Sequence, residues 1–417
     1  MNDTGETILD RPRLGIEEVP FGIDELFFSR TDERGVIQAG NTVFVRVSGF
    51  PEDELIGAPH KLVRHPDMPR AVFQFAWDRL KAGEPVAAYV KNRSKDGRHY
   101  WVFAVMTPVE GGYLSVRLKP SSPTLARIEK IYAAQRQRET ADGIGPEQSR
   151  DELLAAIRDA GFSGYDSFEA ESLAAELIAR SAELRRPKDL RLERFLSMSR
   201  AIHEVEMESE AMMTAFEAIR TIPLNMRILA SRLEAAGGPI SAISVNYGSM
   251  SDEMSAWVRT FIHGQDSAFS RIRDAIVSGL FHYAIAGLMS EMQQSYLAEV
   301  EAVAQEGDGS RRRLLADQSR AYQLRSSDEL KRTGYEAARL SRSVLDMKRY
   351  ITGLSSTRMM CKIESATLSK SGETLVGIVD QLDASQDGIE ERLARISELN
   401  SHVQASTALL RNGAASV

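Results

Sequence analysis

The segment Arg64-His65-Pro66-Asp67-Met68-Pro69 places three ionisable side chains beside two prolines. Arg64 offers a planar fork of N–H donors, which suits a phosphate, a carboxylate or the carbonyl edge of a flavin. His65 can donate or accept a hydrogen bond or bind iron. Asp67 stands where a helix could begin, which favours a helix N-cap over ligand binding. The segment predicts a polar wall against a cofactor, with a capped loop as the simpler alternative.

Three further residues could complete such a site. Trp77 follows Phe73 at helical spacing and could wall a flat aromatic ligand, although ordinary core packing also explains it. Asn41 precedes an apolar helix and could cap it. Asn92 falls in the middle of a predicted strand, where asparagine is disfavoured, so we expect its amide to have a specific partner.

The sequence contains no motif that predicts catalysis. It has no dinucleotide-binding or phosphate-binding glycine motif, no zinc-protease motif and no nucleophile elbow. The seven histidines are scattered without the spacing of zinc ligands. We therefore expect a protein that is not an enzyme and binds no metal through its side chains.

The composition narrows the compartment and the partners. A formal charge of −7 disfavours nucleic acid and anionic membranes as main partners. A single cysteine, Cys361, cannot form an internal disulfide, which favours a reducing cytoplasm. The longest apolar stretch, Ala275–Met289, is too short to span a bilayer. We expect a cytoplasmic protein without a membrane span.

The pattern of the chain changes once. Short β-rich runs alternate with turns and short helices in residues 21–119, which predicts a small domain that combines a sheet with helices. Almost everything after this domain is helical. The predicted organisation is a flexible tail over residues 1–20, the sheet domain over 21–119, a proline-containing linker over 120–124, a helical connector over 125–190 and a long-helix bundle or coiled coil over 191–412.

Three stretches of the helical part carry apolar residues at alternating spacings of three and four, strictly in two of them and loosely in the last. Such a narrow seam requires a partner helix. A bundle within one chain accounts for the seams, and a homodimer is the additional hypothesis. The seam positions are Phe195, Met198, Ile202, Val205, Ser209, Met212, Phe216 and Ile219; Leu330, Thr333, Ala337, Leu340, Val344, Met347, Ile351 and Leu354; and Ile378, Leu382, Ser385, Ile389, Leu393 and Ile396.

Residues 21–119 resemble a PAS domain of the bacterial aerotaxis-receptor type. The resemblance is carried by "AGNTVFVRVSGF", "LIGAPH", "VRHPDMP", "WDRLKAGEP" and "VKNRSKDGRHYW". It implies an α+β fold, an antiparallel sheet with flanking helices, whose pocket holds FAD and reports redox or oxygen status. The cofactor-binding residues that carry over are Asn41, Arg64, His65, Asp67, Trp77 and Asn92.

Two features qualify the cofactor that the resemblance implies. The family often has an aromatic residue after "GEP", where this chain has Val86, so one wall of the pocket could be missing. The sheet domain contains no cysteine, which excludes light-driven adduct chemistry between flavin and cysteine. Haem is the alternative cofactor, and a PAS domain without a cofactor that serves as a scaffold is the alternative function.

The segment Asn225–Met250 resembles the signalling hairpin of chemoreceptors, with its turn contracted to Gly237–Pro239. The resemblance implies a degenerate receptor-like helical module that relays a signal to a protein partner, with a chemotaxis kinase or its adaptor as the candidates. The sequence therefore favours a cytosolic, aerotaxis-like sensor.

Overall fold

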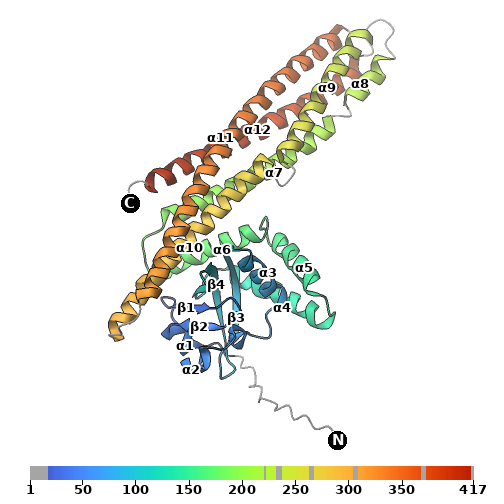
Figure 1. Cartoon of the computed structure of the whole chain (residues 1–417). Coiled ribbons are helices and arrows are strands. Elements are labelled where there is room, and N and C mark those ends of the chain that lie inside the picture. The colour runs from blue at the N-terminus through green and yellow to red at the C-terminus, as the bar shows by residue number, and fades with distance from the viewer. Residues whose placement is uncertain are drawn as a thin grey trace. The chain divides into compact units, whose positions relative to one another are not determined.

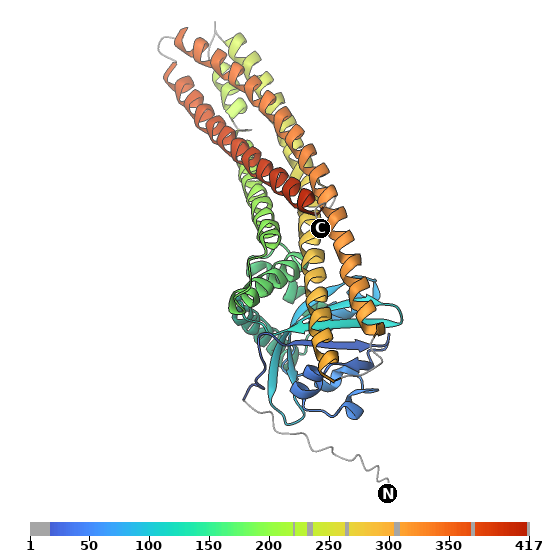
Figure 2. The ribbon, with the colours of Figure 1, turned by 90° about the vertical axis from the view of Figure 1, so that its left-hand side faces the viewer.

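The structure, a computed structural model, describes residues 17–219, 222–231, 237–262, 267–303, 309–367 and 372–414. These residues form two compact units, the first made of residues 1–192 with 280–326 and the second of residues 193–279 with 327–417. Figures 1 and 2 show the chain from two sides.

The first unit contains one five-stranded antiparallel sheet with the strand order β2-β1-β5-β4-β3 (Figure 1). Short runs of β-branched and aromatic residues, buried along most of their length and bounded by glycines at the turns, explain these strands. Gly112, at the β4–β5 turn, has a φ of 152°, and a side chain there would collide with the Thr31 carbonyl oxygen of the adjacent strand. The strands are β1 (Leu26–Thr31), β2 (Ile37–Gly40), β3 (Val86–Arg93), β4 (His99–Val109) and β5 (Gly112–Leu118).

Short helices connect β2 to β3 and cover one face of the sheet. Asn41 caps the first of them by accepting a hydrogen bond from the Phe44 N–H, which confirms the capping interpretation of this residue. The connecting elements are α1 (Thr42–Ser48), α2 (Glu52–Leu55), the 3₁₀ helix η1 (His60–Val63) and α3 (Arg70–Lys81). The α+β fold predicted for the first domain is confirmed.

Three later helices pack on the sheet domain. They are α4 (Thr124–Ala141), α5 (Pro146–Asp159) and α6 (Tyr165–Glu183). The Trp101 ring of β4 faces Tyr132 of α4 at 6.4 Å, and the Tyr89 ring of β3 lies 6.2 Å from Phe168 of α6. The residues predicted as a connector therefore belong to the same compact unit as the sheet.

The two segments predicted as mobile are held by hydrogen bonds where the structure describes them. At the end of the predicted tail, the Val19 N–H donates to the His99 carbonyl at 2.8 Å. In the predicted linker, the Ser121 and Ser122 N–H groups donate to the Glu176 carboxylate at 2.6 and 2.9 Å. Residues 1–16 lie outside the described residues. Backbone groups that find buried partners are fixed, which composition alone does not reveal.

Helix α10 (Ala268–Val303) adds residues to the first unit from Leu280 onward. Arg180 of α6 forms an ion pair with Glu291 at 2.8 Å, and Tyr296 lies 6.1 Å from Phe28 of β1. Residues Ala268–Tyr296 are long and apolar enough to cross a membrane by length and composition, but 67% of the most apolar window is buried in protein. Burial of that extent is typical of a core helix. No membrane is present to test the point, and the absence of a membrane span stays a prediction.

The second unit consists of long helices that run beside one another (Figure 2). The strict seams are confirmed as buried: every described position of both is at most 4% exposed, while Ile219 lies outside the described side chains. In the loose third seam, Leu382, Ile389, Leu393 and Ile396 are buried as predicted, whereas Val379 and Gln386 are buried in place of the predicted Ile378 and Ser385, each one position later. The helices are α7 (Leu190–Ile219), α8 (Ile222–Ala230), α9 (Gly237–Ile262) and α12 (Gly372–Ala414), together with α10 up to Gly279 and α11 (Gly309–Thr367) from Ser327 onward.

The predicted turn at Gly237–Pro239 is wrong, because these residues form the first turn of α9. Proline is tolerated in the first turn of a helix, where its missing N–H has no partner to lose. Helices α8 and α9 contact each other, and the Ser244 hydroxyl donates to the Pro223 carbonyl. The seams are buried within one chain, so the homodimer stays a prediction.

Candidate functional site

A cavity of about 400 Å³ lies between the sheet, α3 and η1. Its size falls in the range of small-molecule sites, which are mostly apolar with a few placed polar groups. The apolar walls are formed by Val72, Phe73, Ala76, Trp77, Leu80, Ala88, Val90, Ala104 and Met106. The polar lining includes Ser29, Thr31, Arg34, His60, Lys61, Arg64, Asn92, Tyr113, Ser115 and Arg117.

Aromatic residues form one wall of the cavity. The Trp77 indole packs edge-on against the Tyr113 ring, with ring centroids 5.3 Å apart. Gly35 has a φ of 77°, and a side chain there would meet the Trp77 ring at 3.0 Å. Glycine at this position can adopt the left-handed backbone conformation, and its lack of a side chain leaves room for the indole. Trp77 lines a cavity here, as the cofactor interpretation predicts.

A buried cation, Arg117 of β5, lies at the inner end of this lining. Its guanidinium donates to the Ser29 hydroxyl at 2.7 Å and lies 2.7 Å from Nε2 of His60. Burial lowers the pKa of Arg117 to about 10. Burial and the neighbouring guanidinium lower the pKa of His60 to about 3, so this imidazole is neutral and can accept a hydrogen bond from Arg117.

Two polar groups in the lining have no hydrogen-bond partner among the described residues: the Ser115 hydroxyl and Nη1 of Arg117. Both residues are buried. Buried polar groups are normally paired, and an unpaired one costs about 1–3 kcal/mol. These groups are therefore available to a ligand. The buried Asn92 lines the same cavity.

Arg64 stands where the cavity meets the protein surface. Its guanidinium stacks on the Phe73 ring at 3.8 Å, and its backbone bridges to Asn92. Burial, opposed in part by Glu139, lowers its pKa. Arg64, Trp77 and Asn92 are thus the predicted site residues that the structure brings together around one cavity.

The other three predicted residues lie outside the lining. Asn41 uses its side chain within the fold, accepting from the N–H groups of Phe28 and Phe44 and donating to the Leu26 carbonyl. His65 is buried and its Nδ1 accepts from the Asp67 N–H at 3.1 Å. Burial, and next the charge of Lys91, lower the pKa of His65 to about 4.

The capping role considered for Asp67 is wrong. Asp67 pairs with Lys91 at 2.8 Å and its carboxylate lies 3.3 Å from Nδ1 of His65, while α3 receives no side-chain cap from its own segment. Val86, flagged as a missing wall, is buried in β3 outside the lining, so the substitution leaves this cavity intact.

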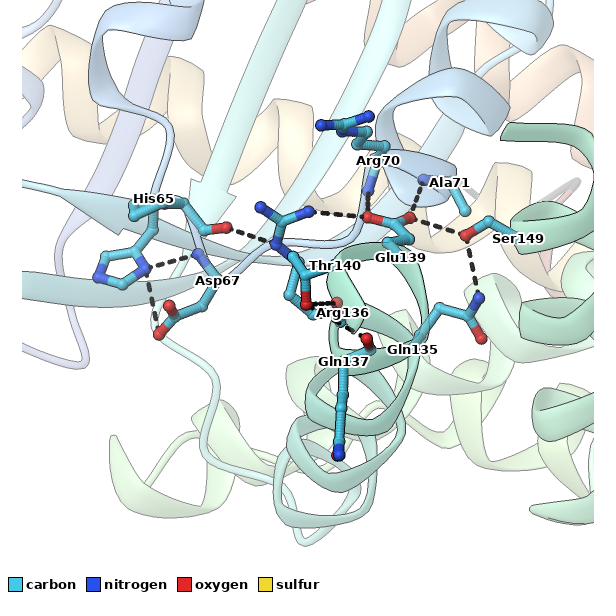
Figure 3. Close-up of polar contacts among 11 residues, drawn as sticks. His65, Asp67, Arg70, Ala71, Gln135, Arg136, Gln137, Glu139, Thr140 and Ser149 are labelled. Carbon is cyan, nitrogen blue, oxygen red and sulfur yellow. Dashed lines mark hydrogen bonds and ion pairs between the residues drawn. The ribbon is translucent and has the colours of Figure 1, made fainter. Parts of the chain in front are cut away.

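Glu139 of α4 caps α3 instead (Figure 3). Its carboxylate accepts hydrogen bonds from the N–H groups of Arg70 and Ala71, at 2.9 and 3.2 Å, and from the Ser149 hydroxyl at 2.7 Å. Burial would raise the pKa of Glu139, but these donors and Arg136 outweigh it and hold the pKa below its ordinary value. A helix outside the sheet domain therefore holds the helix that walls the cavity.

Two glutamates of α6 make similar contacts. Glu169 accepts from the Ala87 N–H of β3 at 2.9 Å, and burial raises its pKa well above the ordinary value. Glu176 accepts from the Tyr89 hydroxyl and from the Ser121 and Ser122 amides. The sheet domain is thus bound to the following helices by three buried carboxylates.

Sequence reasoning missed His60, Ser115 and Arg117. The signal for two of them was present: Tyr113, Ser115 and Arg117 alternate along a strand whose other positions are apolar. A row of polar residues on one face of a buried strand indicates a lined cavity. His60 had no comparable signal, because a 3₁₀ turn places it.

Comparison with known proteins agrees with the fold. Residues 40–115 match the family described as PAS fold. The aerotaxis receptor of Escherichia coli K12 is 43% identical over 128 residues, covering 30% of this chain and 25% of the receptor. Biofilm dispersion protein BdlA of Pseudomonas aeruginosa is 29% identical over 82 residues, 19% of this chain and 20% of that protein. The chain thus spans at most a quarter of the length of these two relatives.

Solved structures share limited similarity with this chain. A blue-light activated histidine kinase of Erythrobacter litoralis is 12% identical over 43% of this chain and 58% of that chain, with a TM-score of 0.24. A fungal LOV domain photoreceptor is 20% identical over 26% and 81%, with a TM-score of 0.20. The assignment rests on the sequence matches: the protein carries an N-terminal PAS domain homologous to that of the aerotaxis receptor, followed by a long helical region.

Proposed function

We infer that the protein is a sensor whose PAS domain binds a flavin, FAD by the aerotaxis-receptor resemblance, and reports its redox state to a protein partner. The observation that carries this inference is the cavity. Apolar and aromatic walls surround two buried polar groups without partners, on Ser115 and Arg117, and Asn92 lines the same cavity. A flat ring system with hydrogen-bonding edges fits both features of this lining.

A bound flavin supplies a redox-dependent change in charge and hydrogen bonding. The residues of this chain could respond to that change in two ways. Arg64 stacks on Phe73 of α3, so a shift of the guanidinium would move the helix that Glu139 caps. Strand β5 carries Ser115 and Arg117 and leads to the Ser121 and Ser122 amides that Glu176 binds. A coupling free energy of about 1–3 kcal/mol would be sufficient for a modest switch.

The alternatives differ in what the cavity holds. Haem would need an axial ligand, and the histidine in the lining, His60, has its Nε2 2.7 Å from the Arg117 guanidinium. Iron binding would therefore disrupt an existing contact, which disfavours haem. A PAS scaffold without a cofactor would leave the polar groups of Ser115 and Arg117 unpaired, at a cost in free energy of unfolding.

The remaining parts of the proposal concern the environment of the sensor. We place it in the cytoplasm as a homodimer without catalytic activity of its own. Its helical region would relay the signal to a protein of a chemotaxis-type pathway, with the kinase or its adaptor as candidates. These partners follow from the resemblance of the helical region to chemoreceptors and from the length of its seams.

An absorption spectrum of the full chain, before and after addition of FAD, tests the function. We expect flavin absorbance that remains with the protein through gel filtration. A Soret band would instead favour the haem sensor. A protein that stays colourless after FAD is added would favour the scaffold.

A variant pair locates the flavin. Arg64→Ala should lower flavin occupancy severalfold while far-UV circular dichroism is unchanged, because it removes both a donor and the group stacked on Phe73. The matched control is Arg98→Ala, whose side chain pairs with Asp96 in the β3–β4 turn outside the cavity lining. Equal occupancy in both variants would remove Arg64 from the site.

A further inference from the structure

The outer face of α11 carries a basic stripe. Its residues are all exposed and recur at alternating spacings of three and four, on the side of the helix away from the buried seam. Asp328, the one acid of the stripe, pairs with Lys331 at 2.7 Å. A narrow stripe of this period is a surface that a second helix can cover. The basic stripe consists of Asp328, Lys331, Tyr335, Ala338, Arg342, Leu345, Arg349, Thr352 and Ser356.

The outer face of α12 carries an acidic stripe with the same alternating spacing. Its residues are also all exposed, and they include carboxylates but no cation. Most of the others are alanines, which allow a neighbouring helix to approach closely. Opposite charges on two stripes of equal period are typical of helices that select each other. The acidic stripe consists of Asp380, Ala384, Asp387, Glu391, Ala394, Glu398, Ser401, Ala405 and Ala408.

The contact between the antiparallel helices α11 and α12 within one chain shows which residues of the two stripes lie level. The Asn400 amide donates to the Ala337 carbonyl at 2.9 Å and lies 2.8 Å from the Ser341 hydroxyl, so Asn400 is level with the turn between them. A helix rises about 1.5 Å per residue. Counting back from Asn400 therefore places Glu398 level with Arg342, to within about one residue.

The same contact recurs further along the two helices. The Gln386 amide donates to the Ile351 carbonyl at 3.1 Å and contacts the Ser355 hydroxyl. Counting forward from Gln386 places Glu391 level with Arg349, again to within about one residue. The two stripes thus present opposite charges at the same heights.

These charges are free to take a partner from another molecule. Arg342 and Glu391 are exposed and form no ion pair with any described residue. Arg349 and Glu398 each pair with a residue three positions away on the same helix, at 3.1 and 2.8 Å. Exposed pairs of this kind contribute little free energy, so they can exchange partners.

We propose that a second copy of this chain binds beside the first, about a two-fold axis parallel to the helices, with the basic stripe of each α11 on the acidic stripe of the other α12. Arg342 of each copy then meets Glu398 of the other, and Arg349 meets Glu391, in two equivalent contacts. The ion pairs set the orientation, and Tyr335 and Leu345, 63% and 51% exposed, supply apolar surface to bury.

The outer faces are what the fold leaves for such an interface, because the strict seam of α11 and the buried side of α12 are covered within one chain. The proposal rests on the homodimer of the proposed function and deepens it by naming the surfaces that meet.

Sedimentation velocity of the full chain over a range of concentrations tests the interface. The wild type should form a dimer that salt weakens, because the charges are exposed. Arg342→Glu and Glu398→Arg should each raise the dissociation constant of the dimer at least about tenfold, since like charges then face each other in both contacts. The control Arg200→Glu reverses a charge at an exposed position of α7 and should change the dissociation constant by less than about twofold. Far-UV circular dichroism should be unchanged in all three variants.

An equal mixture of Arg342→Glu chains and Glu398→Arg chains is the decisive measurement. In a mixed dimer one contact has its two charges exchanged and the other is native, so no like charges meet. The mixture should therefore associate within a fewfold of the wild-type affinity, although each variant alone does not.

The outcomes separate the interface from the rest of the proposed function. If the wild-type chain stays monomeric at every concentration, the homodimer and this interface both fail, while flavin absorbance is a separate measurement. If the wild type is a dimer that neither variant weakens, or if the mixture of weakened variants does not recover, the homodimer stands and the two stripes are not its interface.

Discussion

The two units hold their helices in different ways. In the first unit, carboxylates on α4 and α6 are buried against backbone N–H groups of the PAS domain, as Glu139 and Glu176 show. In the second unit, apolar seams are buried and ion pairs such as Arg392 with Glu208 lie on their partly exposed flanks. Polar contacts of fixed geometry define one docked position, whereas an apolar seam tolerates small shifts in register. The first unit is therefore suited to detecting a small change and the second to transmitting it by repacking.

The largest effect is expected in a seam. Val205→Asp would bury a charge without a partner and should lower the free energy of unfolding by about 4 kcal/mol or more. The loss of helicity during a urea titration measures this change in the free energy of unfolding. The control Met207→Asp changes a residue of the same helix that is 59% exposed, and should cost under about 0.5 kcal/mol. Equal effects would mean that the seam is not packed.

Removal of a docking carboxylate should come next. Glu176→Ala leaves the Tyr89 hydroxyl and two backbone N–H groups buried without an acceptor, so we expect a loss of about 3 kcal/mol. Chemical denaturation followed by tryptophan fluorescence in a Trp257→Phe background would report on Trp77 and Trp101 of the PAS domain. The exposed Glu183→Ala on the same helix is the control. A loss below 1 kcal/mol for Glu176→Ala would contradict the proposed strength of this contact.

A smaller effect is expected from pH. The pKa of His60 is about 3 in the folded chain, against 6.5 for an ordinary imidazole. Between these values the unfolded chain binds a proton that the folded chain does not, so stability falls as pH falls. In His60→Gln, the loss of stability between about pH 6 and 4 should be shallower by about 1.4 kcal/mol per pH unit. Denaturant midpoints of the PAS transition measure this slope, and an unchanged slope would place a solvated imidazole at residue 60.

The smallest effect is expected for a flanking ion pair. Arg392→Gln should cost less than about 1 kcal/mol, because both charged groups keep contact with solvent. The same urea titration as for Val205→Asp applies. A cost comparable to that of Glu176→Ala would remove the distinction between the two kinds of helix contact.

Residues with one dominant local preference were predicted well. The strands follow from short β-rich runs between turns, the strict seams from their spacing, and the cap at Asn41 from an asparagine before an apolar helix. Arg64, Trp77 and Asn92 were also placed correctly around one cavity, although their use by a cofactor stays a prediction. Asp67 was misjudged because its carboxylate pairs with Lys91, and because Glu139, 69 residues after Arg70, accepts hydrogen bonds from the first N–H groups of α3.

The sequence alone determined where the sheet domain ends and the helical region begins, and which faces of the long helices are apolar. These properties depend on patterns within a few residues. It also carried the resemblance that names the cofactor class. The tertiary structure alone decided that α4 and α6 dock on the PAS domain, and that Arg117 lies buried beside His60. It also decided which residues of α11 and α12 lie level with each other. Such contacts join residues far apart in the chain, and their free energies depend on burial and distances that no local pattern encodes.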